Sequence, residues 1–242
     1  MRFLLPTLGL CLLARGQLGL VIRDTIRARR PLSGWPFERI LPAANSLIVL
    51  GDSTAFGTGA TRPERSIAGL FGAAYPDWSV RVVAKNGLFI DQLPPMMPVV
   101  DGRRFTLAVI IIGGNDVLQF STPAQMAAAI DDVLRRVKQL SHRIVLVGQG
   151  NLGASLIFSR WFAKRLTARS QTLRQIYRTV TDRYGAIFVD LYTEAADHPW
   201  RHEPQRFYAA DFFHPTDDGY AMWFANIQHA LRERGWGVGP SG

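Results

Sequence analysis

The sequence predicts an α/β domain in which helices cover a central parallel β-sheet. Two observations carry this prediction: short, continuously apolar runs recur from residue 46 onward, and longer segments with helical periodicity separate them. A strand that is apolar on both faces suits a parallel sheet buried between helices. Parallel strands joined by right-handed crossovers collect ligands at their carboxyl ends, so we expect the functional site there.

Each element follows from its local pattern. The predicted strands are residues 47–50, 80–83, 107–112, 144–147 and 187–189. The predicted helices are residues 65–74, 123–140, 163–184 and 217–234. Ser121-Thr122-Pro123 and Pro215-Thr216 mark the starts of two of these helices. We find no internal repeat, low-complexity tract or linker to a second domain in the sequence.

The first 45 residues form a predicted apolar and basic extension before a domain at 46–236, and residues 237–242 are a predicted flexible tail. Seven arginines in the extension stand against Asp24 and Glu38, so it holds more than half of the net charge of +9. The charge therefore says little about the substrate, and no basic stripe interleaved with aromatics argues for nucleic acid. The sole cysteine, Cys11, excludes an intrachain disulfide.

The extension fits several interpretations. Residues 3–14 are apolar but too short to span a bilayer. A secretory signal has an apolar stretch of this length, and Ala14-Arg15-Gly16 offers small residues at a suitable cleavage spacing, whereas Cys11 lacks the small preceding residue of a lipoprotein signal. We favour residues 1–30 as a segment lying on an anionic membrane surface, with a helix packed on the domain as the alternative. We thus expect membrane-surface association or export rather than a freely cytoplasmic protein.

Four short segments carry the residues of a candidate catalytic site. The first three follow predicted strands, which would bring them to one edge of the sheet. Together they supply a nucleophile, a backbone donor, a side-chain donor and a carboxylate–imidazole pair, the parts that acyl transfer through a serine requires. The segments are Gly51-Asp52-Ser53, Gly87, Gly113-Gly114-Asn115-Asp116 and Asp211-Phe212-Phe213-His214-Pro215.

Taken singly, each segment also has a plain structural explanation. Ser53 follows a strand where helix caps are common, and Gly87 suits a turn. Residues 113–116 could form a turn that requires positive φ. Alternatively, the amide of Asn115 at the end of a strand could donate to a developing oxyanion. Pro215 disfavours helix at the preceding residue, so Asp211 and His214 are expected in a loop where the carboxylate orients the imidazole.

Other polar residues at strand ends have weaker claims. Asp190 is the rival carboxylate for the histidine, and Gln149 and Asn151 are candidates for lining the substrate pocket. Residues 156–162 are apolar and basic, which fits either an acyl-binding wall or lid or the start of a core helix. His198 and His202 are four apart, but Pro199 separates them and a third ligand is lacking, so we expect no metal.

The four segments together resemble the SGNH hydrolases, also called GDSL-type esterases and lipases, over residues 46 to 234. The resemblance implies a flavodoxin-like three-layer α/β/α sandwich with Ser53 as nucleophile, His214 as base and Asp211 orienting the base. It further implies an oxyanion hole formed by the Ser53 N–H, the Gly87 N–H and the Asn115 side chain, without a cofactor. Thr54 replaces the leucine of the GDSL signature, and the residues around Gly87 depart most from the family pattern.

A small-molecule or lipid ester is the expected substrate, while acyl length and the alcohol part stay open. Two alternatives belong to other functional classes. The glycine-rich segment 53–59 also suits a flavodoxin-like phosphate or nucleotide-binding module, although it lacks the lysine of a P-loop. A catalytically silent partner-binding domain attached to a membrane is the other alternative.

Overall fold

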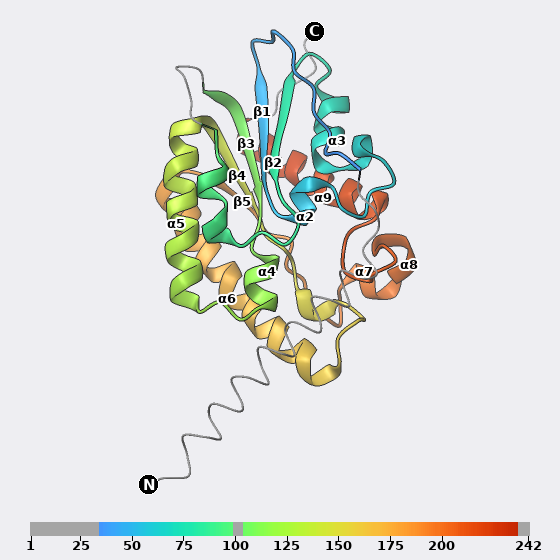
Figure 1. Ribbon diagram of the computed structural model, residues 1–242. Helices are drawn as coiled ribbons and strands as arrows, with labels where there is room; N and C mark the ends of the chain where they lie inside the picture. Colours follow the sequence, from blue (N-terminus) through green and yellow to red (C-terminus); the bar gives the residue numbers. More distant parts are fainter. Residues whose placement is uncertain (1–33, 99–103, 237–242) are drawn as a thin grey trace.

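The structure is a computed structural model that describes residues 34–98 and 104–236. Five parallel strands form a central sheet in the order β2-β1-β3-β4-β5 (Figure 1). The strands are β1 Ser46–Gly51, β2 Ser79–Ala84, β3 Phe105–Ile111, β4 Ser141–Val147 and β5 Ile187–Val189. The predicted α/β class and parallel sheet are confirmed, and each predicted strand overlaps an observed one.

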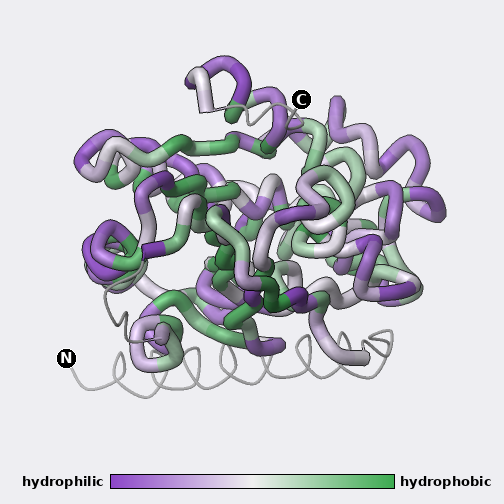
Figure 2. Tube along the Cα trace, turned by 90° about the horizontal axis from the view of Figure 1, so that it is seen from above, coloured by the Kyte–Doolittle hydropathy of each residue, from purple (hydrophilic) through white to green (hydrophobic). Residues whose placement is uncertain are grey.

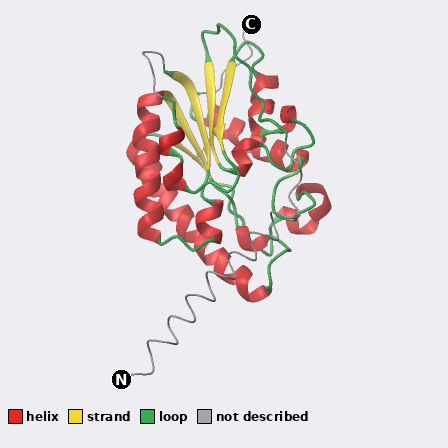
Figure 3. Cartoon of the chain, in the orientation of Figure 1, coloured by secondary structure: helices red, strands yellow, loops and turns green. Residues whose placement is uncertain are grey.

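Helices cover both faces of the sheet, which gives the three-layer sandwich seen in Figures 1 and 3. The long helices are α3 Ile67–Ala74, α5 Pro123–Leu140, α6 Arg160–Tyr184 and α9 Asp217–Glu233. The helices α5 and α6 enclose one hydrophobic core with the sheet, and α3 and α9 enclose the other. Alternate residues of β1 serve the two cores: Ile48 and Leu50 face α5 and α6, and Leu47 and Val49 face the opposite layer. Figure 2 shows the hydrophobic segments gathered in the middle of the molecule.

Local signals fix where the helices begin and end. α5 starts with a capping box in which Thr122 and Gln125 satisfy each other's backbone N–H groups, and Pro123 occupies the first turn. α6 begins at Arg160, earlier than the predicted start at residue 163. It ends at Tyr184 and is capped by Gly185, whose left-handed conformation (φ +62°) closes the last turn.

Four short helices were not predicted. They are α2 Ser53–Phe56, α4 Gly114–Leu118, α7 Pro199–His202 and α8 Pro204–Phe207. α2 and α4 begin directly where β1 and β3 end, and α7 and α8 lie between β5 and α9. Helices of four or five residues span too few turns to show an apolar periodicity, so they cannot be predicted from the sequence pattern.

Part of the predicted extension packs against the domain. Arg39 forms an antiparallel bridge with Val80 of β2, and its guanidinium donates to the carbonyls of Gly72, Tyr75 and Trp78 at 3.0, 2.6 and 3.1 Å. These bonds satisfy backbone carbonyls in the last turn of α3 and just after it. The predicted membrane segment at 1–30 and the tail at 237–242 lie outside the described residues. Where the chain is described, no helix has the length and apolar character to cross a membrane.

Candidate active site

The carboxyl edge of the sheet positions the first segment. Gly51 ends β1 against β3 so closely that a Cβ atom there would lie 1.8 Å from the carbonyl oxygen of Ile111. Glycine is therefore required at this position, which has φ +147°. Asp52 then caps α2 by accepting from the Thr54 N–H at 3.0 Å, and Ser53 becomes the first residue of the helix. The Ser53 N–H is thereby left without an acceptor inside the helix.

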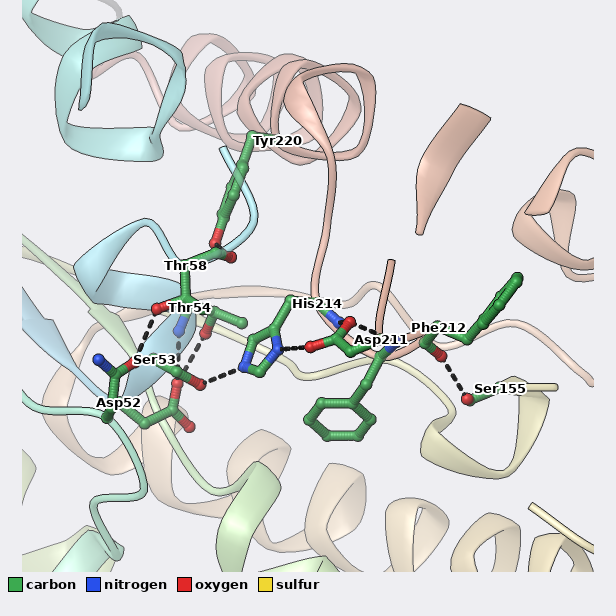
Figure 4. Close-up of polar contacts among 11 residues, drawn as sticks. Asp52, Ser53, Thr54, Thr58, Ser155, Asp211, Phe212, His214 and Tyr220 are labelled. Carbon is green, nitrogen blue, oxygen red and sulfur yellow. Dashed lines mark hydrogen bonds and ion pairs between the residues drawn. The ribbon is translucent and has the colours of Figure 1, made fainter. Parts of the chain in front are cut away.

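Ser53, His214 and Asp211 form one chain of hydrogen bonds (Figure 4). The Nε2 atom of His214 lies 2.9 Å from the Ser53 hydroxyl oxygen, and its Nδ1 atom lies 2.5 Å from Oδ2 of Asp211. All three side chains are buried or nearly so, with Asp211 fully enclosed. This is the arrangement in which a carboxylate orients an imidazole that takes a proton from a serine.

The loop that carries Asp211 and His214 is held rigidly. Oδ1 of Asp211 accepts from the N–H groups of Phe213 and His214 at 3.0 and 2.9 Å. Phe212 adopts a left-handed conformation (φ +53°), and its carbonyl accepts from the Ser155 hydroxyl at 2.6 Å (Figure 4). A phenylalanine with positive φ is rare, so the surrounding bonds must hold the backbone in this conformation.

The charge state of Asp211 follows from the same contacts. Burial by itself would raise its pKa. The hydrogen bond and charge of the His214 side chain and the two N–H donors outweigh burial, so the pKa of Asp211 is lowered from its ordinary value. Asp211 therefore stays a carboxylate, the form that stabilises a protonated imidazole.

Asn115 and Gly87 lie on loops that are tied to each other. The amide of Asn115 donates to the carbonyl of Leu88 at 3.0 Å, and Oδ2 of Asp116 accepts from the N–H of Ile90 at 3.1 Å. An amide has two N–H groups, so Asn115 keeps one that bonds to no other described residue. Gly87 has φ +78° and no atom within 4 Å of the place where a Cβ would stand. The space beside its main chain is thus open to a substrate.

Two buried carboxyls behind this edge have raised pKa values. Burial raises the pKa of Asp52 to about 6, although bonds from Thr54 and the charge of His214 oppose it. Burial likewise raises the pKa of Asp116 to about 6, against bonds from Ile90 and Ser121. Asp52 also accepts from the Gln149 side chain at 3.3 Å, which connects the ends of β1 and β4.

The rival carboxylate, Asp190, makes no hydrogen bond with His214, although it borders the cavity described below. Its oxygens pair with Arg174 at 2.8 Å and Arg178 at 2.7 Å, and it accepts from the N–H of Tyr192. The structure thus brings His214 to Asp211 and leaves Asp190 bound to α6. Gln149 and Asn151, the two predicted lining residues, do border the cavity described next.

A cavity of about 270 Å³ lies beside the triad. Thr54 and Phe213, neighbours of the nucleophile and the base in sequence, form part of its wall. Trp200 and Tyr208 from the α7–α8 region also line it, together with His198. Burial, followed by the charge of Arg201, lowers the pKa of His198 to about 4, so this imidazole is neutral near pH 7.

From the sequence we considered His198 and His202 as metal ligands and expected no metal there. Over residues 34–98 and 104–236, no group of three histidine, cysteine, aspartate or glutamate side chains is placed to hold a metal ion. His198 instead caps α7, since its Nδ1 atom accepts from the Trp200 N–H at 3.3 Å.

Comparison with known proteins identifies the family. A family model described as GDSL-like lipase/acylhydrolase matches residues 49–222. The chain belongs to this family. It is therefore a hydrolase of ester bonds, as the sequence analysis expected. No curated protein matches the chain.

Solved structures of lipolytic proteins share the fold. A lipolytic G-D-S-L family protein from Veillonella parvula is 13% identical, with a TM-score of 0.62, and the match covers 78% of this chain and 99% of that one. An extracellular lipase from Streptomyces rimosus is 19% identical, with a TM-score of 0.59 and coverage of 77% and 100%. Phospholipase A1 from Streptomyces albidoflavus is 16% identical, with a TM-score of 0.59 and coverage of 79% and 99%.

Sequence reasoning missed two features of this GDSL hydrolase. One is the contact of Asp116, because its bond to the Ile90 N–H depends on a turn after β2 that has no recognisable sequence pattern. The wall formed by Trp200 and Tyr208 was also missed, because α7 and α8 are too short to predict. Clustered aromatics between residues 200 and 213 were the available signal.

Proposed function

We propose that the protein hydrolyses carboxylic esters through an acyl-enzyme on Ser53. The observation that carries the proposal is the unbroken hydrogen-bond chain from Ser53 through His214 to Asp211. His214 removes the Ser53 proton as the oxygen attacks the ester carbonyl, and the protonated imidazole then delivers this proton to the leaving alcohol. Water repeats the cycle on the acyl-enzyme and releases the acid.

In this proposal the oxyanion is held by three donors. They are the N–H of Ser53, the N–H of Gly87 and the free amide N–H of Asn115. The bond between Asn115 and the Leu88 carbonyl supports the assignment, since it holds the two loops together at the sheet edge. Donors fixed before the reaction stabilise developing charge without having to reorganise.

The alternative of a phosphate- or nucleotide-binding module finds no support in the glycine-rich segment. A Cβ at Gly57 would lie 2.6 Å from the Ser66 side chain, and one at Gly59 would lie 2.1 Å from the carbonyl oxygen of Pro215. The Thr58 carbonyl accepts from the Tyr220 hydroxyl at 2.8 Å. The segment thus packs against the protein's own chain, and its glycines are explained by this packing.

Replacement of Ser53 tests the proposal. Ser53→Ala should fold normally, because the side chain contributes only the bond to His214, and should lose covalent labelling by a fluorophosphonate probe. Ser159→Ala is a matched control, since this exposed serine caps α6 without a side-chain bond, and it should label like wild type. Labelling of Ser53→Ala near one probe per chain would refute the assignment.

A panel of esters tests which acyl length the enzyme prefers. We propose that the cavity beside the triad holds one arm of the ester, so p-nitrophenyl esters of increasing acyl length should show a preferred length. Two structural neighbours are named lipase and phospholipase A1, and lipid esters therefore belong in the panel. Equal kcat/KM for all lengths would mean that the acyl chain lies outside the cavity.

A further inference from the structure

The segment that leads into α6 ends in an exposed tip that carries both apolar and basic side chains. We define the tip by Leu156, Arg160, Trp161, Lys164 and Arg165. Leu156 is 45% exposed and Trp161 is 57% exposed, although both are large and hydrophobic. The three cations lie on the same first turns of the helix. Single exposed apolar residues are ordinary, but two of this size beside three cations form a patch.

The charge of the tip is not balanced. No aspartate or glutamate occurs in the sequence between Asp132 and Asp182. None of the three tip cations joins an ion pair with a described residue, whereas Arg174 and Arg178 farther along α6 are paired with Asp190. The guanidinium of Arg165 instead lies 3.9 Å from the ring centre of Trp161, which keeps its charge at the apolar surface.

The tip is also continuous with the catalytic loop. Phe158 and Phe162 lie under the tip with ring centres 5.5 Å apart, and Phe158 lies 6.3 Å from Phe213. Phe213 in turn stands 5.2 Å from the ring of His214. Figure 1 shows the first turns of α6 projecting past the carboxyl edge of the sheet, near α4. A row of aromatic rings therefore runs from the exposed tip to the proposed base.

We propose that this tip docks the protein on an anionic phospholipid surface, with Leu156 and Trp161 in the interface and the three cations beside lipid phosphates. Tryptophan prefers the boundary between water and hydrocarbon, and arginine and lysine near such a surface each add to binding. Docking there would bring the catalytic edge of the sheet to the membrane. This inference rests on lipid esters being among the substrates of the proposed function.

A second candidate occupant is the protein's own N-terminal segment. Arginines at positions 15, 23, 27, 29 and 30 give that segment the same charge sign as the tip, which opposes its seating there. Phosphate groups of lipids have the opposite sign. Charge complementarity therefore favours the lipid surface.

The first experiment measures binding of the full chain to vesicles of phosphatidylglycerol and phosphatidylcholine. All proteins carry Ser53→Ala, so that binding is read without hydrolysis and independently of the catalytic proposal. Arg160→Gln with Lys164→Gln should weaken binding about fivefold for each charge removed, and the difference should shrink as salt rises. Arg81→Gln with Arg232→Gln removes the same charge from exposed positions on β2 and α9 and should bind like the parent.

The apolar part of the tip has its own matched control. Trp161→Ala should weaken vesicle binding several-fold, whereas Trp35→Ala should not. Trp35 is 87% exposed but precedes the segment that runs antiparallel along β2, at one side of the sheet, whereas α6 contacts β5 at the other side. The comparison separates the effect of losing any exposed tryptophan from the effect of losing Trp161.

A fluorophore at the tip locates the contact directly. Cys11→Ser removes the native thiol, and Leu156→Cys or, in the control, Arg232→Cys at an exposed position in the last turn of α9 then carries an environment-sensitive dye. Anionic vesicles should shift the emission to the blue at position 156 and leave it unchanged at position 232. Unchanged emission at 156, or equal vesicle binding by the tip variants and their controls, would overturn the proposal. Failure of Ser53 to label would instead refute the catalytic proposal alone.

Discussion

At the residue scale, the amide of Asn115 donates one N–H to the Leu88 carbonyl, and our proposal gives the other N–H to the oxyanion. Asn115→Ala should lower kcat by roughly 10²–10³ with little change in KM, since an oxyanion donor acts on the transition state. Steady-state kinetics on a soluble ester measure both constants. A rise in KM alone would make Asn115 a binding contact or a turn residue.

The two aspartates that compete for His214 differ in their surroundings. Asp211 bonds to Nδ1 of His214, whereas Asp190 is paired with Arg174 and Arg178. Asp211→Asn should lower kcat by about 10³–10⁴, because the imidazole loses its orientation and its counter-charge. Asp190→Asn is the matched control and should keep kcat near wild type. The opposite pattern, a dead Asp190→Asn beside an active Asp211→Asn, would reverse the assignment.

At the element scale, α4 is held in place by bonds at both of its ends. Asp116 accepts from the Ile90 N–H in the loop after β2. Arg169 of α6 donates to the carbonyls of Val117 and Ser121 at 2.9 and 2.5 Å, and its guanidinium lies 4.9 Å from the ring centre of Phe120. These bonds tie the loops after β2 and β3 to each other and to α6, which fixes the position of Asn115 relative to the Leu88 carbonyl next to Gly87.

Asp116 also makes stability depend on pH. Burial raises its pKa from the ordinary value of 3.8 to about 6 in the folded protein. Between these two pH values the folded protein therefore binds a proton at Asp116 that the unfolded chain has lost. The unfolding free energy should therefore fall as pH rises from about 4 to 6, by at most about 3 kcal/mol from this group. Asp116→Asn should remove this part of the slope. Urea unfolding at pH 4.5, 5.5 and 7 measures it.

The control for that series is Asp77→Asn, which removes a carboxylate that is exposed. A pH slope in Asp116→Asn as steep as that of wild type would show that Asp116 is not the titrating group. The neighbouring Asp52 also has a raised pKa and stays in place in both variants. Part of the slope should therefore remain.

How far sequence predicts an element depends on its length and burial. The strand at 47–50 was predictable because residues facing both cores are apolar, and α5 because Thr122 and Pro123 mark its start. The approach of Ser53, His214 and Asp211 was expected from the combination of the four segments and from the family resemblance, whereas the loop geometry that achieves it has no local sequence pattern. The left-handed Phe212 and the α7–α8 wall depend on tertiary contacts that no local pattern encodes.

At the scale of the whole molecule, the sheet separates two exposed apolar regions. The tip at the start of α6 lies at the carboxyl edge with the candidate site. Trp35, Ile40 and Leu41 are also exposed, and the Leu41 N–H bonds to Ser79 at the start of β2. Ile40 and Leu41 therefore lie beside the start of β2, at the amino edge of the sheet, and Trp35 precedes them in the segment that runs antiparallel along β2.

Deletion of residues 1–30 tests our proposal that this segment attaches the protein to a membrane surface. The truncated chain keeps Arg39 and its three bonds to the end of α3, so it should fold and hydrolyse a small soluble ester at a nearly unchanged rate. Its vesicle binding should be weaker than that of the full chain, because arginines contribute on the order of 1 kcal/mol each near anionic lipid. Raised salt should reduce this difference but leave the apolar contribution of residues 3–14.

A deeper deletion, of residues 1–45, is the matched control for stability. It leaves the carbonyls of Gly72, Tyr75 and Trp78 without the Arg39 guanidinium and should cost on the order of 3 kcal/mol of unfolding free energy. Co-sedimentation with anionic vesicles and thermal unfolding measure both effects on the same samples. Equal sedimentation of the full chain and the 1–30 deletion would contradict a membrane role for the segment. Aggregation of the 1–30 deletion would mean that these residues belong to the folded domain, because the contacts of residues 37–39 alone would then be too few to hold it.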